Sequence, residues 1–495
     1  MMERYRRANE VLHPTRSAME RAITGERPRR KKKPLKALIP AGVAGVAGVA
    51  GVAAIALLVT GIPGLSSGSG PLGGSAYAIA LPEYPDLPQY PTEPLGGDEA
   101  AWERFNQDFD LYWNAWRDYQ EEVPALRDTP ALMEALEDFT EQSTTLALAG
   151  EDNRVYSPIS LWFALAMLAE TTGGDTRQQV LDVLGASDTE QLREWADILW
   201  HALYLDDGTA TSLLGTSIWL NEDIGFHQDT LNILAQHYYT GSYQVPMGTD
   251  KADNALSAWV SEQTKGLIGS DGKVLETNTD TLAVLASTLY YQAGWRNEFH
   301  PSNTKEDIFT AADGTETRVD FMHMTQDATF LRQDGYQAAS LSTTFGQMIF
   351  VLPDEGISPA GLLADPEFLE EAADFEDGIY GEVQWSVPKF DVSSDLDLKT
   401  TLEGLGITDV FHPEVSDFSP LTDLEPVWLD QAKQIARVKV NEEGVEAAAV
   451  TLLADSGASA PPEDPKVCIM DLDRPFLFLI QAEGVTLFVG VVEQV

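Results

Sequence analysis

Side chains that could do catalytic chemistry are scattered along this sequence rather than grouped. None of the seven histidines takes part in an HExxH motif or another spacing typical of a metal site, so each is interpreted as a surface histidine or a hydrogen-bonded buried one. Carboxylates are so abundant that no pair of them points to acid–base catalysis. We therefore expect no metal, no cofactor and no enzyme activity. The histidines are His13, His201, His227, His237, His300, His323 and His412.

Two short glycine motifs match loops that occur in enzymes. GLSSG (64–68) matches the GxSxG pattern of serine hydrolases, and GSGPLG (68–73) matches the GxGxxG pattern of dinucleotide-binding proteins. Both patterns work where a strand leads into a helix, whereas both motifs lie here in a stretch rich in glycine, proline and serine. We interpret them as chance matches. A membrane-anchored hydrolase that uses GLSSG is the weakest functional hypothesis.

Charge and cysteine content exclude further classes. The net charge of −46 would repel phosphate and sulfate groups, which argues against nucleic acids and heparin-like polyanions as partners. The charge is also uneven, because residues 1–36 carry 12 Lys+Arg and 4 Asp+Glu while the other 459 residues carry 20 and 74. The only cysteine, Cys468, excludes an intrachain disulfide and lies in an apolar stretch typical of an inert thiol. Together with the lack of an N-glycosylation sequon, this favours a bacterial surface protein.

An uncharged apolar segment follows the basic N-terminal tail. The segment ALIPAGVAGVAGVAGVAAIALLVTG (37–61) is preceded by RPRRKKKPLK (27–36) and is long enough to cross a hydrocarbon core of about 30 Å as a helix. Positive residues before the segment place the N-terminus in the cytoplasm and the body outside. A signal peptide is the alternative, although its apolar region would be shorter and its basic region nearer to residue 1. We predict a single-pass transmembrane helix at 37–61 that anchors the protein in the cell membrane.

The rest of the chain divides into three parts. Residues 62–97 are rich in Gly, Pro and Ser and are expected to form an extended linker. Residues 98–122 place aromatic side chains at helical spacing, which predicts an accessory helix docked on the main domain. Residues 126–495 have the composition of one continuous globular domain. The aromatic residues of the accessory helix are Trp102, Phe105, Phe109, Trp113 and Trp116.

Helices are predicted mostly early in this domain and strands mostly late. Residues 129–148, 157–172 and 175–185 have helical patterns, with Thr129 as an N-cap and Pro130 at the first helical position. The order of the elements predicts an α+β fold built on a large buried sheet. Several strand-like runs are too apolar to have a solvent-exposed face. These runs are 281–295, 346–353, 383–390, 436–440 and 486–495.

The segment EEGVEAAAVTLLA (442–454) has the side chains of a central strand and the flanks of a loop. Read with a period of two, the face that starts at Val445 carries no charge and nothing large before Leu453, and the opposite face carries a single charge, Glu446. The segment has no proline, so every residue can donate a ladder hydrogen bond, and Gly444 supplies the backbone freedom of a hinge. The residues that follow it read as an exposed loop.

This segment resembles the proximal hinge of the reactive-centre loop of the serpins, and the resemblance runs along nearly all of residues 126–495. Residues 153–185 resemble the segment that contains the serpin shutter, with Ser157, Pro158 and Ser160 in the matching places. LASTLYYQAGWRNEF (285–299) resembles the breach strand, with Trp295 in the tryptophan position. Four further segments match in the same order: SVPKF, DLKTTLEGLGITDVF, DRPFLFLI and TLFVGVV.

The resemblance implies a serpin fold with a large central mixed β-sheet, additional sheets, about nine helices and an exposed reactive-centre loop. It also implies a suicide-substrate inhibitor of serine proteases. An extracellular protease attacks the loop, forms an acyl-enzyme, and is trapped in that covalent complex when the cut loop inserts into the central sheet. The implied hinge consists of Glu442, Glu443, Gly444, Val445, Glu446, Ala447, Ala448, Ala449, Val450 and Thr451.

The usual loop length of the family places the scissile bond between Ala458 and Ser459, and a register shifted by one or two residues is the alternative. Alanine on the acyl side suits a protease with a small primary pocket, such as an elastase-like or subtilisin-like enzyme. Leu453 is less favoured as the cleavage point, because too little strand would precede it.

Two positions depart from the family pattern. The shutter histidine is replaced by Gln434, which can bridge strands by hydrogen bonding but does not titrate near neutral pH, and the usual breach-strand asparagine is replaced by Ser287. Val445 stands where the hinge often has Thr or Ser, and an uncharged residue there is compatible with insertion. The hinge therefore favours inhibition over the alternative, a serpin-fold surface protein that binds or supports without inhibiting.

Overall fold

The computed structural model describes ten stretches of the chain, and all of them belong to one compact unit, residues 46–495. The stretches are residues 49–61, 77–82, 84, 87–94, 99–121, 123–150, 152–269, 273–365, 367–442 and 466–495.

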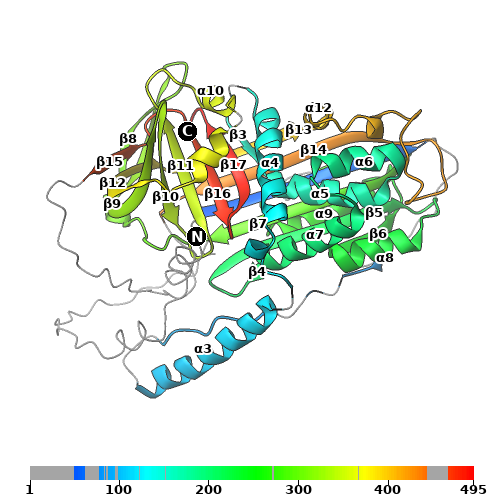
Figure 1. Cartoon of the computed structure of the whole chain (residues 1–495), viewed down its shortest axis with the longest axis horizontal. Helices are drawn as coiled ribbons and strands as arrows, with labels where there is room; N and C mark the ends of the chain where they lie inside the picture. The colour runs from blue at the N-terminus through cyan, green and yellow to red at the C-terminus, as the bar shows by residue number, and fades with distance from the viewer. Residues whose placement is uncertain are drawn as a thin grey trace. The chain divides into compact units, whose positions relative to one another are not determined.

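A mixed eight-stranded sheet forms the centre of this unit (Figure 1). Most neighbouring strands are antiparallel, and β5 and β6 are parallel. In order across the sheet the strands are β13 (Phe390–Asp397), β14 (Val427–Val440), β1 (Val49–Gly61), β7 (Thr281–Ala293), β5 (Ala210–Asn221), β6 (Thr240–Val245) and β2 (Ala78–Ala80), with β4 (Leu205–Asp206) paired to β5.

A second mixed sheet has nine strands, and its parallel pair is β12 and β15. Its last strand, β3, leads directly into the helix α5 (Pro158–Thr171), so this end of the sheet lies beside the start of α5. In order the strands are β15 (Val467–Asp471), β12 (Ile379–Pro388), β9 (Glu316–Gln333), β10 (Tyr336–Ser342), β11 (Gln347–Pro353), β16 (Phe476–Ala482), β17 (Val485–Val492) and β3 (Arg154–Tyr156), with β8 (Lys305–Thr310) paired to β9.

Ten α-helices are present among the described residues. The helix α5 (Pro158–Thr171) is buried along its whole length, which its run of apolar residues after the N-cap Ser157 predicts. The other helices are α3 (Glu99–Gln120), α4 (Pro130–Ala147), α6 (Gly174–Val183), α7 (Thr189–Leu203), α8 (Gln228–His237), α9 (Asp250–Gln263), α10 (Pro359–Leu363), α11 (Phe368–Ala373) and α12 (Lys399–Leu405).

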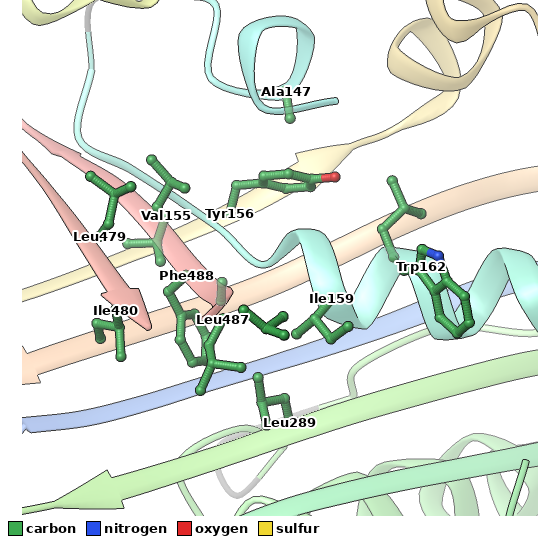
Figure 2. Packing of buried hydrophobic residues seen from close by; sticks show 14 of the residues in the cluster. Ala147, Val155, Tyr156, Ile159, Trp162, Leu289, Leu479, Ile480, Leu487 and Phe488 are labelled. Carbon is green, nitrogen blue, oxygen red and sulfur yellow. The ribbon is translucent and has the colours of Figure 1, made fainter. Parts of the chain in front are cut away.

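The middle of the central sheet is covered on both faces, and every residue of β7 is buried. On one face α5 contacts β1 and β7, and Figure 2 shows Ile159 of α5 and Leu289 of β7 gathered with Phe488 of β17. On the other face α9 contacts β5 and β7 and closes a smaller apolar cluster that includes Trp219 and Trp259. A strand in the middle of such a sheet needs apolar residues on both of its sides.

The predicted α+β fold with a large central mixed sheet is confirmed. The predicted helices at 129–148, 157–172 and 175–185 correspond to α4, α5 and α6, and Pro130 occupies the first turn of α4 as expected. Thr129 lies at the N-cap position, but its side chain makes no capping hydrogen bond.

The prediction of a transmembrane helix at 37–61 is wrong for residues 49–61, which form the strand β1. Residues 37–48 lie outside the described residues. The physical reason is that an uncharged apolar run suits either a helix in lipid or a strand buried on both faces, and both environments require the same composition. Among the described residues, no helix is both long enough and apolar enough to cross a membrane.

Part of the predicted linker is bound along the body. The strand β2 pairs with the edge strand β6, and the Tyr84 ring stacks on Trp200 with a centroid distance of 5.7 Å. The ring of Tyr90 meets Phe109 of α3 edge-on at 5.8 Å. These contacts are consistent with the composition, since tyrosine supplies a large apolar face within an otherwise polar stretch.

The aromatic accessory helix corresponds to α3. Its residue Tyr112 donates a hydrogen bond of 2.6 Å to the buried carboxylate of Asp207, next to β4, and Trp116 packs against the main apolar core. The aromatic stripe of α3 therefore contacts the linker at one end and the body at the other.

Candidate functional site

The strands β7 and β14 are separated by a single strand position, here called the central slot, and β1 fills it. In Figure 1 β1 is the blue strand between green β7 and orange β14. Every residue from Ala50 to Thr60 has a partner on both sides, in β14 and in β7. β1 is antiparallel to both neighbours, so it begins at the end of the slot where β7 and β14 finish.

Trp295, the residue predicted at the breach, lies at that end of the slot, which is called the breach below. The Trp295 side chain is 3 % exposed, and its indole Nε1 donates to the carbonyl oxygen of Asn441 at 3.0 Å. Asn441 directly follows β14, so this bond joins the segment after β7 to the segment after β14. The sequence predicted Trp295 at the breach but gave no indication of its hydrogen bond to Asn441.

Glu442, the first residue of the predicted hinge, is bound in a polar cluster beside the breach. Its Oε1 accepts from Thr304 Oγ1 at 2.7 Å and lies 3.3 Å from the ammonium nitrogen of Lys389. Lys389 also lies 3.0 Å from Asp320. Burial opposes ionisation of Glu442, but the hydrogen bond from Thr304, a backbone N–H and the Lys389 ammonium outweigh it and lower the pKa of this carboxyl group.

The predicted shutter residues Ser157, Ser160 and Gln434 lie together, and all three are fully buried. The Ser157 backbone N–H donates to Gln434 Oε1 at 2.9 Å, and Gln434 Nε2 donates to the Ser157 carbonyl oxygen at 3.0 Å. The hydroxyl oxygens of Ser157 and Ser160 are 2.9 Å apart at the N-terminus of α5. Gln434 thus connects β14 to the start of α5, and an amide does so without titrating.

The two departures from the family pattern lie on opposite sides of the filled slot. Ile55 of β1 is the register partner of both Gln434 in β14 and Ser287 in β7. Gln434 therefore has an inserted strand between it and Ser287. Gln434 was expected to bridge strands by hydrogen bonding; its amide bonds instead to the backbone of Ser157, at the start of α5.

The other predicted site residues fall outside the described part of the chain. These are Glu443, Gly444, Val445, Glu446, Ala447, Ala448, Ala449, Val450 and Thr451 of the hinge, the reactive bond Ala458–Ser459, and the GLSSG and GSGPLG motifs. The described chain stops at Glu442, beside the breach, and resumes at Lys466, just before β15 of the second sheet.

No group of three potential metal ligands occurs within the described ranges. Burial raises the pKa of the Cys468 thiol to about 11, which keeps it protonated and unreactive at neutral pH.

Sequence reasoning missed the strand β1. Its signal was present: residues 49–61 carry no charge and several β-branched side chains, and their 13 residues match the 13 residues of β7. The pattern has no period that separates a buried strand from an apolar helix, and glycine at positions 45, 48 and 51 disfavours a helix only weakly in lipid.

A comparison with family models gives a match over residues 137–495 to the model described as "Serpin (serine protease inhibitor)". Among curated proteins, plasminogen activator inhibitor 1 of Bos taurus is 30 % identical over 359 residues, which covers 68 % of this chain and 86 % of that protein. Serpin-Z2B of Triticum aestivum is 28 % identical over 359 residues, with 68 % and 89 % covered.

The fold is also similar to that of solved structures. The thermophilic serpin tengpin in its native state matches with a TM-score of 0.64 at 23 % identity, and the match covers 73 % of this chain and 94 % of that one. The family model, which matches residues 137–495, includes the slot-forming strands β7 and β14 but not β1.

Proposed function

The chain belongs to the serpin family, and on that premise we propose that it is a suicide-substrate inhibitor of serine proteases. In this proposal the protease nucleophile attacks the bond after Ala458, the acyl-enzyme forms, and the segment from Gly444 onward enters the central sheet as a strand. The chain acts as a substrate that traps the protease and does no catalysis itself.

One observation carries the proposal: the strand that would insert starts at the mouth of the slot. β14 ends beside the breach, and Glu442 is held there by Thr304 and Lys389. A chain that turns back after Glu442 would run antiparallel to both β14 and β7, as β1 does. The uncharged face from Val445 to Thr451 fits one buried face of the sheet, and the opposite face would carry a single charge, Glu446.

The proposed target is an elastase-like or subtilisin-like protease. Alanine at position 458 fills only a small primary pocket, and a pocket built for a long basic or aromatic side chain would gain little from it. We further propose that the target is met outside the cell: the basic residues 1–36 precede the apolar segment 37–61, which is long enough to span a membrane when residues 49–61 are not in the sheet. Protease treatment of intact cells, with loss of the body but retention of the tail, would support that location.

The test is to mix the protein with elastase and subtilisin and to separate the products on a denaturing gel. A covalent complex that survives denaturation supports the proposal, and mass spectrometry then identifies the cut bond. Because β1 fills the slot, the same test is run on Leu57→Asp, which places a charge in the middle of β1. Cleavage of both forms without any complex would contradict the proposal.

A second candidate function follows from the filled slot itself. A serpin whose slot is permanently occupied would be a binding or structural protein, because the cleaved loop would have no strand position to enter. The full-length protein and Leu57→Asp would then behave alike, and both would be cut as simple substrates. This outcome separates the two candidates without knowledge of a ligand.

A further inference from the structure

The central slot already contains a strand from the chain's own N-terminal region. We propose that residues 49–61 are a built-in occupant of this strand-binding site, and that they must leave before the cleaved reactive-centre loop can enter. The second half of this inference rests on the proposed inhibitory function, whereas the occupancy of the slot does not. Residues 49–61 and the hinge then compete for one site, and inhibition is held off while β1 is seated.

The occupant fills the slot along its whole length. β1 pairs with β7 from Val49 opposite Ala293 to Thr60 opposite Thr281, and these partners are the two ends of β7. A second strand cannot share these ladder hydrogen bonds, because the backbone groups of β7 and β14 that point into the slot are already paired with β1. Entry of the loop therefore requires displacement of β1.

The occupant also reaches the breach, where insertion would have to begin. Ala50 is the register partner of Lys439, two residues before Asn441. A hinge that folds back after Glu442 would meet the first residues of β1 before it could form its first pair with β7. Displacement would therefore start at the N-terminal end of β1.

Side chains of the occupant belong to both cores of the molecule. Leu57 is fully buried in the main cluster on the α5 side, and Ala56 is 5 % exposed in the cluster that includes Trp259 of α9. Adjacent residues in a strand point to opposite faces, so these two side chains place β1 firmly within the layered core. A charge at Leu57 would be buried without a partner and would expel the strand.

The connection after β1 is long enough for β1 to leave the slot while β2 stays paired with β6 at the edge of the sheet. Gln244 N donates to the Tyr77 carbonyl oxygen at 2.9 Å, and β2 pairs with β6, so the chain is held again directly after residues 62–76. Those fifteen residues can span up to about 50 Å when extended, which is enough slack for β1 to move out of the slot.

Seating in the slot and crossing a membrane are alternative fates of the same residues. When residues 49–61 are in the sheet, only residues 37–48 of the apolar segment remain, and a membrane-spanning helix needs about 20. A protein with β1 seated is therefore not anchored by this segment.

The occupancy is tested by a cross-link in the full-length protein. Ala56 and Ala286 are register partners in β1 and β7 and lie in the same apolar cluster, so cysteines at both positions can form a disulfide only when β1 is seated. Thr60→Cys with Ala286→Cys is the matched control, because position 60 is four residues, roughly 13 Å, away along the strand. We expect the 56–286 bond to form at least about tenfold faster than the 60–286 bond, as followed by peptide mass spectrometry. Equal rates, or neither bond, would overturn the proposed occupancy.

The competition is tested on the same cross-linked protein and on Leu57→Asp. Leu111→Asp is the matched control, because Leu111 lies on α3 and is 68 % exposed. We expect Leu57→Asp to form at least about tenfold more covalent protease complex than Leu111→Asp or the oxidised Ala56→Cys/Ala286→Cys protein. If the oxidised protein forms as much complex as its reduced form, β1 does not block the loop and the inference fails while the inhibitor proposal stands. If the 56–286 bond forms and no variant makes a complex, the occupancy stands and the inhibitor proposal fails.

Discussion

Gln434 and Ser157 exchange two hydrogen bonds, of 2.9 and 3.0 Å, in a site with no access to water. The Gln434 amide accepts from the Ser157 N–H and donates to the Ser157 carbonyl oxygen, so the middle of β14 is fixed to the first turn of α5. Any movement that widens the central slot must either keep this pair together or break it.

We expect Gln434→Ala to lower the free energy of unfolding by about 2–4 kcal/mol, because the buried Ser157 N–H loses its acceptor and a cavity remains. Denaturant unfolding measures the loss. The control Gln384→Ala removes an exposed glutamine of β12 and should change stability by less than about 0.5 kcal/mol. A similar result for the two variants would mean that the Gln434–Ser157 pair adds nothing to the fold.

Acid should weaken the breach through Glu442. Its pKa is lowered in the folded state, so its stabilising contribution is complete above its ordinary value of 4.5 and is lost as the pH falls through the lower folded-state value. Glu442→Gln should therefore be less stable than the wild type at pH 7 by about 1–2 kcal/mol, and the difference should shrink at pH 3. Denaturant midpoints at the two pH values test this, with the exposed Glu355→Gln as the control. A difference that is the same at both pH values would contradict the assignment.

The buried carboxylate of Glu170 depends on Arg193. The guanidinium makes two hydrogen bonds to it, at 2.7 and 2.8 Å, and Tyr238 donates a third at 3.0 Å. Arg193→Ala leaves this charge buried without its cation, which should cost about 3–5 kcal/mol in thermal or denaturant unfolding.

The matched control for that variant is Arg318→Ala. Arg318 lies 3.5 Å from Glu306, and both side chains are more than half exposed, so its loss should cost less than about 1 kcal/mol. If Arg193→Ala were as mild as this control, water would have to reach Glu170 in the folded protein.

A charge on the inward face of the hinge should convert an inhibitor into a substrate. Val445→Arg would carry an unpaired charge into the sheet, slow loop insertion, and let water release the protease first. The measured quantity is the number of inhibitor molecules cut for each covalent complex formed. The substitution is made in whichever form, wild type or Leu57→Asp, yields the complex. Glu446→Arg places the same charge on the opposite face, and we expect a smaller rise. An equal rise in both variants would show that the two faces are not distinguished.

Local patterns were sufficient to predict the fold class and the elements on which several candidate site residues lie. Ser157 before an apolar run predicts the start of α5, and Trp295 follows a strand-like segment whose order among its neighbours matches the family. The breach cluster could not be predicted in the same way. Thr304, Lys389 and Glu442 come from three distant segments, and hydrogen bonding among them depends on the tertiary arrangement.

The assignment of residues 49–61 failed for a related reason. An apolar composition indicates only that a segment is removed from water, and both a lipid bilayer and the interior of a sheet remove it. The difference lies in β7 and β14, which are the partners of β1 and are encoded far along the chain. A length equal to that of β7 and the concentration of valine were hints, but neither excluded a helix.

The pairing of β1 with both of its neighbours also bears on self-association. A sheet that opens in its middle offers a vacancy to a strand from another molecule, and repeated donation of that kind links monomers into open-ended polymers. With Ala50 to Thr60 paired on both sides, the vacancy is closed from within the same chain. The seated strand would then keep the protein monomeric during heating, the condition under which a sheet with an open strand position polymerises most readily.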